Sequence, residues 1–482
     1  MNSPLPLSPF RITLLPLSTM KPQKKQPIGD KLNAGKRKRG GPAAGNVPSR
    51  TVPEVGDIED LLPFTDGEVR SIRASLLEWY DNNRRDLPWR RGGDGGEEGE
   101  DKGAYGVWVS EVMLQQTRVQ TVIEYYNRWM LKWPSLHHLA SSSLEEVNEM
   151  WAGLGYYRRA RFLLEVIASQ WLMPSHEFYD GAKMIVTGGE GFPRTVAQLL
   201  KVPGIGEYTA GAIASIAFKE VVPAVDGNVI RVLARLKAIS ANPKDSVTMK
   251  KFWRLAGQLV DNSRPGDFNQ SLMELGATVC TPLNPACSSC PISSKCQARS
   301  ISEKDTSVAV TDYPVKVVKI KKRNDFSAVC VLEILRGTQE SEFLIVKRPE
   351  EGLLAGLWEF PSIEVAKEDD SSQRRKAVDR FLKQFFGFDP RKCNIVLRED
   401  IGEFVHIFTH ISLNIYVELL VVQLKDKTHF LRKQTEKNTS WKLVDCEALA
   451  SMGLTSSVRK VYSMIQKFKQ NNLTPQKQKK LG

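Results

Sequence analysis

The chain has 482 residues, of which 41% are hydrophobic, so it is globular and long enough for more than one domain. No apolar run approaches the length that crosses a bilayer, which excludes a membrane-spanning protein. The net charge of +13 lies at the two ends, because residues 1–50 carry +9, the tail from Gln466 carries +5, and residues 51–465 are left at −1. The overall basicity is therefore weak support for nucleic-acid binding, which must rest on individual residues.

Residues 1–60 are predicted to be a disordered basic segment that carries targeting signals. They are rich in Pro, Ser and Lys and show no helical period after the first twenty. Those twenty contain Arg11 and no acid, as in an organelle transit peptide, and Lys36–Arg39 has the composition of a nuclear signal. We expect a nuclear protein, with a mitochondrion or chloroplast as a further compartment. A solvated basic tail explains either pattern equally well.

Helical patterns fill residues 61–298, which we predict to be one all-α domain. Apolar residues recur at helical spacing over Arg70–Tyr80, Val107–Leu114, Leu144–Trp151, Ala160–Trp171, Thr195–Leu200, Tyr208–Phe218, Val229–Leu236 and Phe252–Val260. The stretch Gly92–Gly103 interrupts them with six glycines and a charge of −4. Its composition predicts a flexible acidic loop.

A glycine turn, Pro203-Gly204-Ile205-Gly206, joins two of these helical patterns. Its glycines let the backbone turn sharply and leave N–H groups free at the start of the next helix, which suits a phosphate oxygen of DNA. Asp226 then opens a further helix, either as an N-cap or as a carboxylate beside the bound strand, or as both. Taken alone, Gly-x-Gly before a helix is usually only a loop.

Four of the seven cysteines lie within 17 residues at 6-2-5 spacing, namely Cys280, Cys287, Cys290 and Cys296. Nothing in the sequence resembles a secretory signal, so we expect a metal site rather than disulfides. Zinc usually takes paired, closely spaced ligands, and the 6-2-5 spacing favours an iron–sulfur cluster instead. The dispersed Cys330, Cys393 and Cys446 are expected to be structural or incidental.

The glycine turn, the later aspartate and the cysteine run, in this order, resemble the endonuclease III superfamily of DNA glycosylases. Three further stretches resemble its MutY-type, A/G-specific adenine glycosylases, namely Leu87–Arg90, Ser110–Thr117 and Gly153–Tyr157. The resemblance covers roughly residues 68–298 and continues more weakly to about residue 465. It implies a helix-hairpin-helix domain that holds the DNA backbone at Pro203–Gly206 and a 4Fe-4S cluster on the four cysteines.

The resemblance implies an enzyme that removes adenine paired with 8-oxoguanine or guanine in double-stranded DNA. An N-glycosidic bond breaks when an acid protonates the purine and a carboxylate stabilises the sugar cation. Motif positions assign the acid to Glu111 and the carboxylate to Asp226, with Asn228 beside it. Burial would raise the pKa of Glu111 and keep its proton available. On periodicity alone, Glu111 would be a solvated helix residue.

Tyr208 stands where superfamily members that also cut the DNA backbone carry a lysine. That lysine forms a Schiff base with the sugar, whereas the order here is Gly206-Glu207-Tyr208-Thr209. We therefore predict a monofunctional glycosylase in which water completes the reaction. The alternatives are a bifunctional glycosylase and lyase for oxidised pyrimidines, and a non-catalytic DNA-binding scaffold.

The target base must leave the helix stack to be reached. The resemblance assigns the wedge around the mispaired purine to Gln115, Gln116, Thr117, Leu154 and Tyr156. It assigns the lining of the adenine pocket to Arg85, Trp89 and Glu274. Without the resemblance, each of these residues would be predicted to be structural.

Residues 326–465 change to strand-like patterns over Ala328–Leu335, Glu342–Lys347, Phe404–His406 and Ser412–Gln423. Gly356–Pro361 resembles the entry to the Nudix catalytic loop, but Gln373–Arg380 lacks the metal-binding acids. We predict a Nudix-like α/β domain without hydrolase activity. The resemblance assigns recognition of 8-oxoguanine to Phe408, Thr409 and His410, where the family has Phe-Ser-His.

Residues 299–325 are predicted to be an interdomain connector, and 466–482 a basic tail. The connector contains no cysteine, so we predict no zinc site there. Docking of a repair clamp on this connector is a further prediction for which the residues offer no direct support. We expect a monomer that does not associate with membranes.

Overall fold

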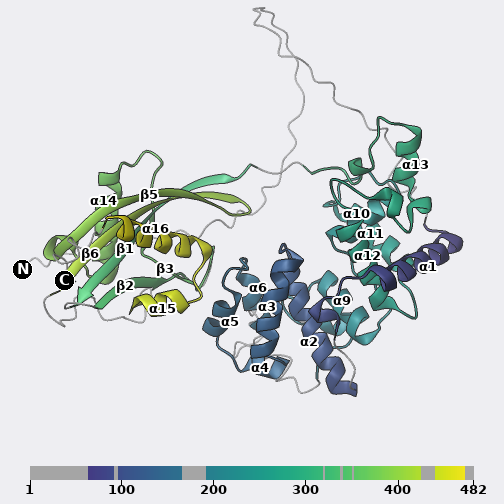
Figure 1. Ribbon diagram of the computed structural model, residues 1–482, viewed down its shortest axis with the longest axis horizontal. Helices are drawn as coiled ribbons and strands as arrows, with labels where there is room; N and C mark the ends of the chain where they lie inside the picture. The colour runs from purple at the N-terminus through teal and green to yellow at the C-terminus, as the bar shows by residue number, and fades with distance from the viewer. Residues whose placement is uncertain are drawn as a thin grey trace, which may run out of the picture.

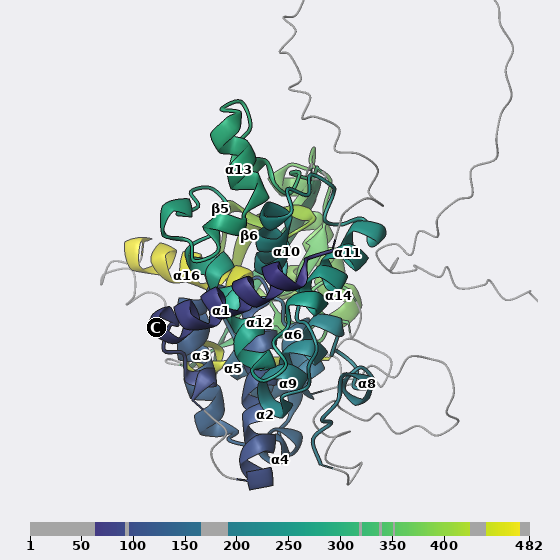
Figure 2. The same ribbon diagram turned by 90° about the vertical axis from the view of Figure 1, so that its right-hand side faces the viewer.

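The computed structural model describes residues 63–91, 96–164, 191–317, 321–336, 340–349, 352–424 and 440–472. Predictions for residues 1–62 and 473–482 lie outside these ranges. A helical body is followed by a body built on one sheet, which confirms the predicted fold class (Figure 1). Figure 2 views the helical body with the sheet behind it. Within the described ranges, no helix is long and apolar enough to cross a membrane.

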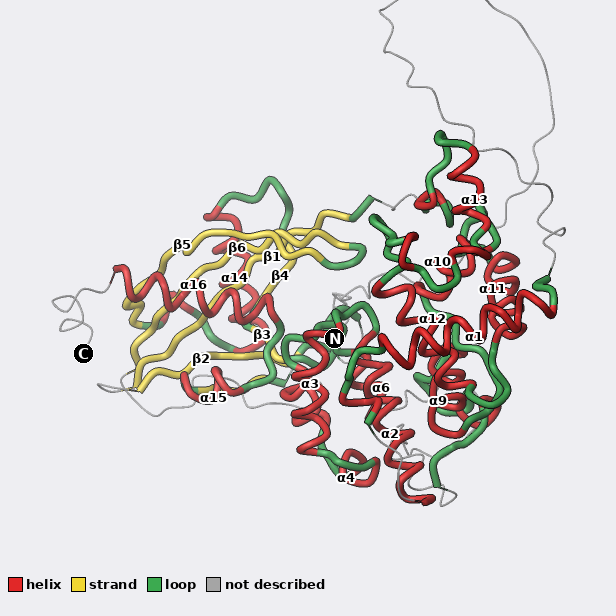
Figure 3. The backbone as a smooth tube through the Cα atoms, turned by 45° about the vertical axis from the view of Figure 1, so that its right-hand side comes forward, coloured by secondary structure: helices red, strands yellow, loops and turns green. Residues whose placement is uncertain are grey.

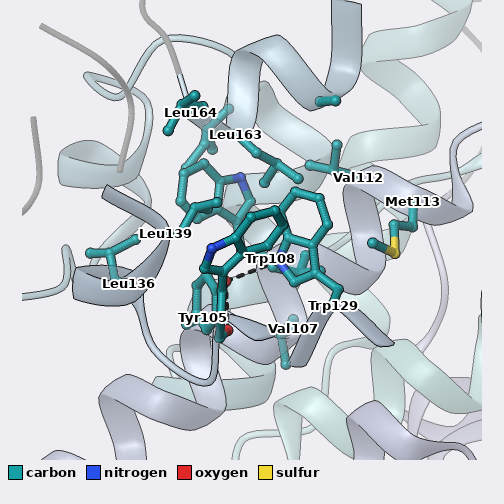
Figure 4. Close-up of a cluster of buried hydrophobic side chains, with 14 of the residues drawn as sticks. Tyr105, Val107, Trp108, Val112, Met113, Trp129, Leu136, Leu139, Leu163 and Leu164 are labelled. Atoms are coloured by element: carbon teal, nitrogen blue, oxygen red, sulfur yellow. Dashed lines mark hydrogen bonds between the residues drawn. The ribbon is translucent and has the colours of Figure 1, made fainter. Parts of the chain in front are cut away.

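Within the described ranges, the first helical core lies between seven helices. They are α2 (Gly96–Leu114), α3 (Val119–Lys132), α4 (Leu136–Ala140), α5 (Leu144–Trp151), α6 (Arg158–Leu164), α8 (Val196–Leu199) and α9 (Glu207–Phe218). Large aromatic side chains fill this core, and Figure 4 shows Tyr105 and Trp129 at its centre. The Trp129 Nε1 donates to the Tyr105 hydroxyl at 2.9 Å, which in turn donates to the Trp133 carbonyl at 3.1 Å. The buried polar atoms of both rings are thereby satisfied.

The second helical core packs α1 (Asp66–Asn83) against α10 (Gly227–Leu236), α11 (Ser246–Leu259) and α12 (Pro265–Thr278). The sequence patterns did not predict α12, because glycine and proline weaken helical propensity. Its glycines serve close packing: a Cβ on Gly266 would lie 2.7 Å from the Ser215 carbonyl oxygen, and one on Gly276 would lie 2.7 Å from the Cβ of Asn228. Both helical cores thus meet along α12, which runs beneath the site described below.

The prediction of a flexible loop over the acidic stretch is wrong from residue 96 onward. Helix α2 begins at Gly96 and continues without a break to Leu114. Glu100 and Asp101 near its start pair with Arg194 at 2.8 and 3.5 Å. Acidic side chains near a helix N-terminus favour the helix through its dipole, and these ion pairs add to that effect. The predicted helix over 160–171 is confirmed to Leu164, and its remainder lies outside the described residues.

In the part of the chain that the structure describes, the second body contains a seven-stranded sheet with β3-β2-β1-β6-β5 in its main path. Its strands are β1 (Arg323–Arg336), β2 (Glu340–Lys347), β3 (Trp358–Glu359), β4 (Ser362–Glu364), β5 (Asn394–Ile407), β6 (Ile411–Leu424) and β7 (Trp441–Val444). The central pair, β1 and β6, is parallel. Alternate residues of β6 enter two cores, one under α14 (Ser371–Phe386) and one under α15 (Cys446–Ser451) and α16 (Ser456–Asn472).

The ends of the two bodies differ from the predicted boundaries. Helix α13 (Gln297–Lys304) and Tyr313 pack against Ala238 at the end of α10, so the helical body runs to residue 313. Helix α16 continues into the predicted tail as far as Asn472. In both places an apolar side chain outside the predicted limits finds a buried neighbour, which composition alone does not reveal.

The two bodies contact each other on the side of α5 and α6 (Figure 1), and Figure 3 shows the same two bodies coloured by secondary structure. The Tyr157 hydroxyl donates to the Leu454 carbonyl at 3.3 Å, and Lys347 pairs with Glu145 at 3.3 Å. A Cβ on Gly453 would lie 2.7 Å from the Glu149 backbone, so the chain approaches α5 closely there. These contacts set the sheet beside the loop that precedes α6.

Candidate active site

Glu111 lies buried near the end of α2, where α2 packs against α9, and only 6% of its surface is exposed. Tyr208, in the first turn of α9, donates its hydroxyl to Glu111 Oε2 at 2.5 Å. Burial raises the pKa of Glu111 to about 7, while the tyrosine hydrogen bond lowers it and the Asp226 charge raises it. A carboxyl group with this pKa holds a proton at neutral pH and can give it up.

Asp226 is the N-cap of α10 and accepts three hydrogen bonds. Its Oδ1 accepts from the Asn228 and Val229 amides at 2.9 and 2.7 Å, and its Oδ2 accepts from Asn228 Nδ2 at 2.7 Å. Burial raises the pKa of Asp226, and these hydrogen bonds oppose that rise. The residue is therefore both a helix cap and a carboxylate held close enough to Glu111 to affect its pKa.

Arg231 connects this carboxylate to the cysteine segment, a link that the sequence did not indicate. Its Nη2 donates to Asn228 Oδ1 at 2.8 Å and to the Gly276 carbonyl at 2.6 Å. Its Nε donates to the Cys280 carbonyl at 2.8 Å. The orientation of the Asn228 amide, and through it that of Asp226, is thus fixed from the far side of α10.

Glu274 is the centre of the pocket predicted for adenine, and 1% of it is exposed. The Arg85 side chain binds it through two hydrogen bonds at 2.6 and 2.9 Å, the Arg85 amide through a third at 3.3 Å, and Arg90 through a fourth at 2.9 Å. These cations lower the pKa of Glu274 against the effect of burial, so it is a fixed negative charge. Trp89, next to Arg90 in the chain, stands edge-on to Tyr126. Arg90 was missed, although it lies within the Leu87–Arg90 motif.

The predicted wedge residues come from two loops, after α2 and before α6. Gln115 and Gln116 are exposed, Tyr156 is 48% exposed, and Gln116 and Tyr156 have left-handed backbone angles, φ 56° and 47°. Leu154 instead lies buried in the first helical core, so it supports the loop from within. Strained backbone at two exposed side chains marks these loop tips as candidates for insertion into DNA.

A single buried cation, Arg159, holds the two wedge loops together. Its Nη1 donates to the carbonyls of Val112, Met113 and Gln115 at 2.9, 2.9 and 2.5 Å. Its Nη2 donates to Thr117 Oγ1 and to the carbonyls of Leu154 and Gly155 at 3.2, 3.3 and 3.2 Å. Burial lowers the pKa of Arg159 to about 10, so it remains charged at neutral pH. No sequence pattern distinguishes Arg159 from the basic residues around it.

Replacing Arg159 with leucine should destabilise the protein, because buried carbonyls of both loops lose their donor. We expect a loss of about 2–4 kcal/mol in the free energy of unfolding, measured by denaturant titration. Arg158→Leu is the matched control, since the neighbouring Arg158 is exposed. Equal effects of the two substitutions would contradict the role of Arg159 in holding the two loops together.

The residues Phe408, Thr409 and His410 form the turn between β5 and β6. Thr409 and His410 are exposed, and the Thr409 hydroxyl lies 2.9 Å from the Tyr156 hydroxyl. Phe408 packs edge-on against His406 and its amide donates to the Ile411 carbonyl at 2.8 Å. The structure therefore joins a wedge residue of the helical body to the predicted base-reading turn of the sheet body.

The glycine turn has the predicted form. Val202 and Ile205 anchor it in the first core, Gly204 has φ 83°, and a Cβ there would lie 2.9 Å from Phe162. Gly206 is the exposed N-cap of α9 and carries no capping side chain, so the first amides of that helix lack a side-chain partner. Such amides are suited to an anion.

The four clustered cysteines lie near the end of α10, and none of them forms a disulfide. No three His, Cys, Asp or Glu side chains in the described ranges could hold a single metal ion, but a four-iron cluster is larger than one ion. Burial, together with charge on the other three thiols, raises the pKa of Cys290 to about 11, so all four lie within electrostatic range. Arg235, 2% exposed, donates to Cys280 Sγ at 3.2 Å. Among the described residues it pairs with no carboxylate, so an anionic thiolate cluster fits it.

The segment that lacks the Nudix acids forms the start of α14. The nearest carboxylates are occupied by arginines: Arg398 binds Asp379 at 2.8 Å and Glu418 at 3.0 Å, and Arg375 binds Glu418 at 2.5 Å. The absence of hydrolase activity stays a prediction.

The chain is similar to known families, to proteins of known activity and to solved structures. Residues 109–258 match the model of the HhH-GPD superfamily base excision DNA repair protein, and 331–464 match the NUDIX domain. The chain is 58% identical to an adenine DNA glycosylase of Arabidopsis thaliana over 84% of this chain and 66% of that protein. It is 46% identical to an adenine DNA glycosylase of Homo sapiens over 74% of this chain and 68% of that protein. A solved thermostable thymine-DNA glycosylase is 25% identical over 48% of this chain and 97% of its own, with a TM-score of 0.40.

Proposed function

Because the chain belongs to the adenine DNA glycosylase family of base-excision repair, we propose that it hydrolyses the N-glycosidic bond of adenine opposite 8-oxoguanine or guanine and leaves the DNA backbone intact. The observation that carries this proposal is the buried Glu111, hydrogen-bonded to Tyr208 and facing Asp226, with a pKa of about 7. The three side chains supply an acid, a stabilising carboxylate and no amine.

In this mechanism Glu111 gives its proton to the adenine ring, which makes the base a better leaving group. The bond from the sugar C1′ to the base breaks with its electron pair leaving on adenine, and the ionised Asp226 stabilises the sugar cation. Water then forms the new bond at C1′ and gives a proton to the Glu111 carboxylate, which restores the acid. Tyr208 has a phenol where a lyase has an amine, so no Schiff base forms and no strand break follows.

The opposite base is proposed to be read where the two bodies meet. The Tyr156 ring is exposed at the wedge, and its hydroxyl contact with Thr409 connects it to the turn on the sheet. Thr409 keeps a hydroxyl that can donate to or accept from a base edge. Recognition of 8-oxoguanine would thus involve residues 253 positions apart in the sequence.

We also propose that Cys280, Cys287, Cys290 and Cys296 hold a 4Fe-4S cluster. When bound, the cluster would tie the end of the helical domain together, and Arg235 would neutralise part of its charge. We expect about four iron atoms and four sulfides per chain by chemical analysis. Cys290→Ser should lose iron and lower the melting temperature, whereas Cys446→Ser, at an exposed thiol in the other body, should do neither. Full iron content in both variants would contradict the assignment.

A nuclear location, with a mitochondrion or chloroplast as a further compartment, is proposed from Lys36–Arg39 and the first twenty residues. These residues lie outside the described ranges. A fluorescent fusion with and without residues 1–50 tests it, and an unchanged distribution would contradict it. Docking of a repair clamp on the connector stays a prediction.

One assay separates the proposed function from its alternatives. Purified protein is incubated with duplexes that contain adenine opposite 8-oxoguanine, or thymine glycol, and each sample is divided before alkali treatment. Breaks that appear only after alkali, and only in the adenine duplex, support the proposal. Breaks without alkali at thymine glycol would establish the bifunctional alternative. Tight binding without excision would indicate a scaffold.

A further inference from the structure

The hydroxyl group of Tyr208 has two acceptors and only one proton to donate. Glu111 Oε2 lies 2.5 Å from it and Met273 Sδ lies 3.3 Å from it. The three side chains come from α2, α9 and α12, and α9 packs against both other helices. Met273 has no role in the chemistry proposed above, yet among the described residues its sulfur is the one atom besides the carboxylate to which this hydroxyl donates.

We propose that Met273 is a positioning residue that tunes the acidity of Glu111 by competing for the Tyr208 proton. When Glu111 is ionised, Tyr208 donates to the carboxylate. When Glu111 is protonated, it can donate to the tyrosine oxygen, and the tyrosine proton turns to the thioether. A thioether is a weak acceptor, so it offers this second arrangement without capturing the hydroxyl permanently. The inference rests on the proposed function, because it assumes that Glu111 is the acid.

The other groups that act on Glu111 are fixed, which leaves the tyrosine proton as the adjustable one. Asp226 at the start of α10 raises the pKa of Glu111, and Arg90 lowers it. Asp226 is held by the amides of α10, and Arg90 by Glu274 and Gln270. Glu274, the charged neighbour on α12, is itself bound by Arg85. A hydroxyl, in contrast, turns freely between acceptors.

Met273→Leu removes the sulfur and keeps nearly the same volume. The ionised carboxylate keeps its Tyr208 donor, but the protonated acid loses the arrangement in which the tyrosine proton turns to the sulfur, so the pKa of Glu111 falls. Excision needs the protonated acid, so the fall in rate at high pH should begin at a lower pH. We expect a shift of about half a pH unit, which is about a threefold loss of excision above pH 8 and none below pH 6.

The test measures the pH dependence of excision for adenine opposite 8-oxoguanine in a double-mutant cycle. Tyr208→Phe should shift the fall in rate to a higher pH, because the Glu111 carboxylate loses its hydrogen-bond donor and the pKa of Glu111 rises. In that background Met273→Leu should cause no further shift. Met130→Leu, at a partly buried methionine of the first helical core, controls for packing and should leave the pH of this fall unchanged.

The outcomes are distinct. A loss that is equal at all pH values, or a shift that persists in the Tyr208→Phe background, would show that Met273 acts only by packing. If the natural protein excises adenine and Met273→Leu leaves the pH at which the rate falls unchanged, this inference is overturned and the proposed function is not. Failure of the natural protein to excise adenine would overturn the proposed function itself.

Discussion

Glu111→Gln should reduce adenine excision by a factor on the order of 10² to 10⁴, the usual contribution of a general acid. The amide fills the same space beside Tyr208 but has no acidic proton to give to the base. Binding to the same duplex should remain, because the glycine turn and the wedge loops are untouched. Single-turnover excision and a binding titration measure the two effects separately. Excision within threefold of the natural protein would refute the role of the acid.

The pH dependence gives an independent check on the same residue. The pKa of Glu111 is raised to about 7, and the protonated form is the active one. Excision at sub-saturating protein, which reports ionisations of the free enzyme, should therefore be high below pH 7 and fall tenfold per unit above it. A rate that rises through pH 8 would mean that Glu111 acts as a base or not at all.

The same ionisation affects stability in a definite direction. A carboxyl group whose pKa is about 7 when folded and 4.5 as its ordinary value binds its proton more tightly in the folded state. Its contribution to stability is present below pH 4.5 and is lost as pH rises through 7. Glu111→Gln avoids this loss, so at pH 8 it should be more stable than the natural protein by up to about 3 kcal/mol. Urea titrations at pH 5 and pH 8 measure the difference. An inactive variant that is no less stable shows that the loss is chemical.

Sequence patterns predicted those parts of the fold in which one face of a helix or strand is buried. Apolar residues recur at helical spacing in Val229–Leu236 and on alternate positions in Ser412–Gln423. The structure has helix α10 and strand β6 at these places. Helix α12 was missed because its glycines are selected for contact with Ser215 and Asn228, against local propensity. Packing partners that lie far away in the sequence decide such a segment, and local periodicity does not contain them.

The site shows the same division. Glu111, Tyr208 and Asp226 followed from motif positions, and the structure brings them together. Arg159 was missed because an arginine in a run of basic residues looks solvated until the two loops close over it. The contact between Tyr156 and Thr409 was missed because it depends on how two bodies meet. Chemistry carried by a residue type is visible in sequence, whereas support from a distant loop is not.

Asp226→Asn separates the two roles of that residue. Asparagine is as good an N-cap as aspartate, and its side-chain oxygen can still accept from the Asn228 and Val229 amides. The hydrogen bond from Asn228 Nδ2 is lost, because an amide nitrogen cannot accept it, but the cost of burying a charge is removed as well. The free energy of unfolding should therefore change by no more than about 1 kcal/mol. Excision should fall by a factor on the order of 10³, because a neutral amide cannot stabilise the sugar cation as a buried carboxylate does.

Asp226→Ala completes the comparison, since alanine removes both the charge and the cap. It should lose excision to a similar extent and also lose about 1–2 kcal/mol of stability as the amides of α10 lose their acceptor. Asp245→Asn, at the N-cap of α11, is the matched control: it keeps a cap away from the site and should leave excision unchanged. If Asp226→Asn retained excision near the natural rate, the carboxylate would be only a cap, and the sugar cation would need another stabilising group. If Asp226→Asn instead lost excision at unchanged stability, the charge of Asp226 would be needed for the reaction and not for the helix. The capping hydrogen bonds would then serve to keep the buried carboxylate ionised.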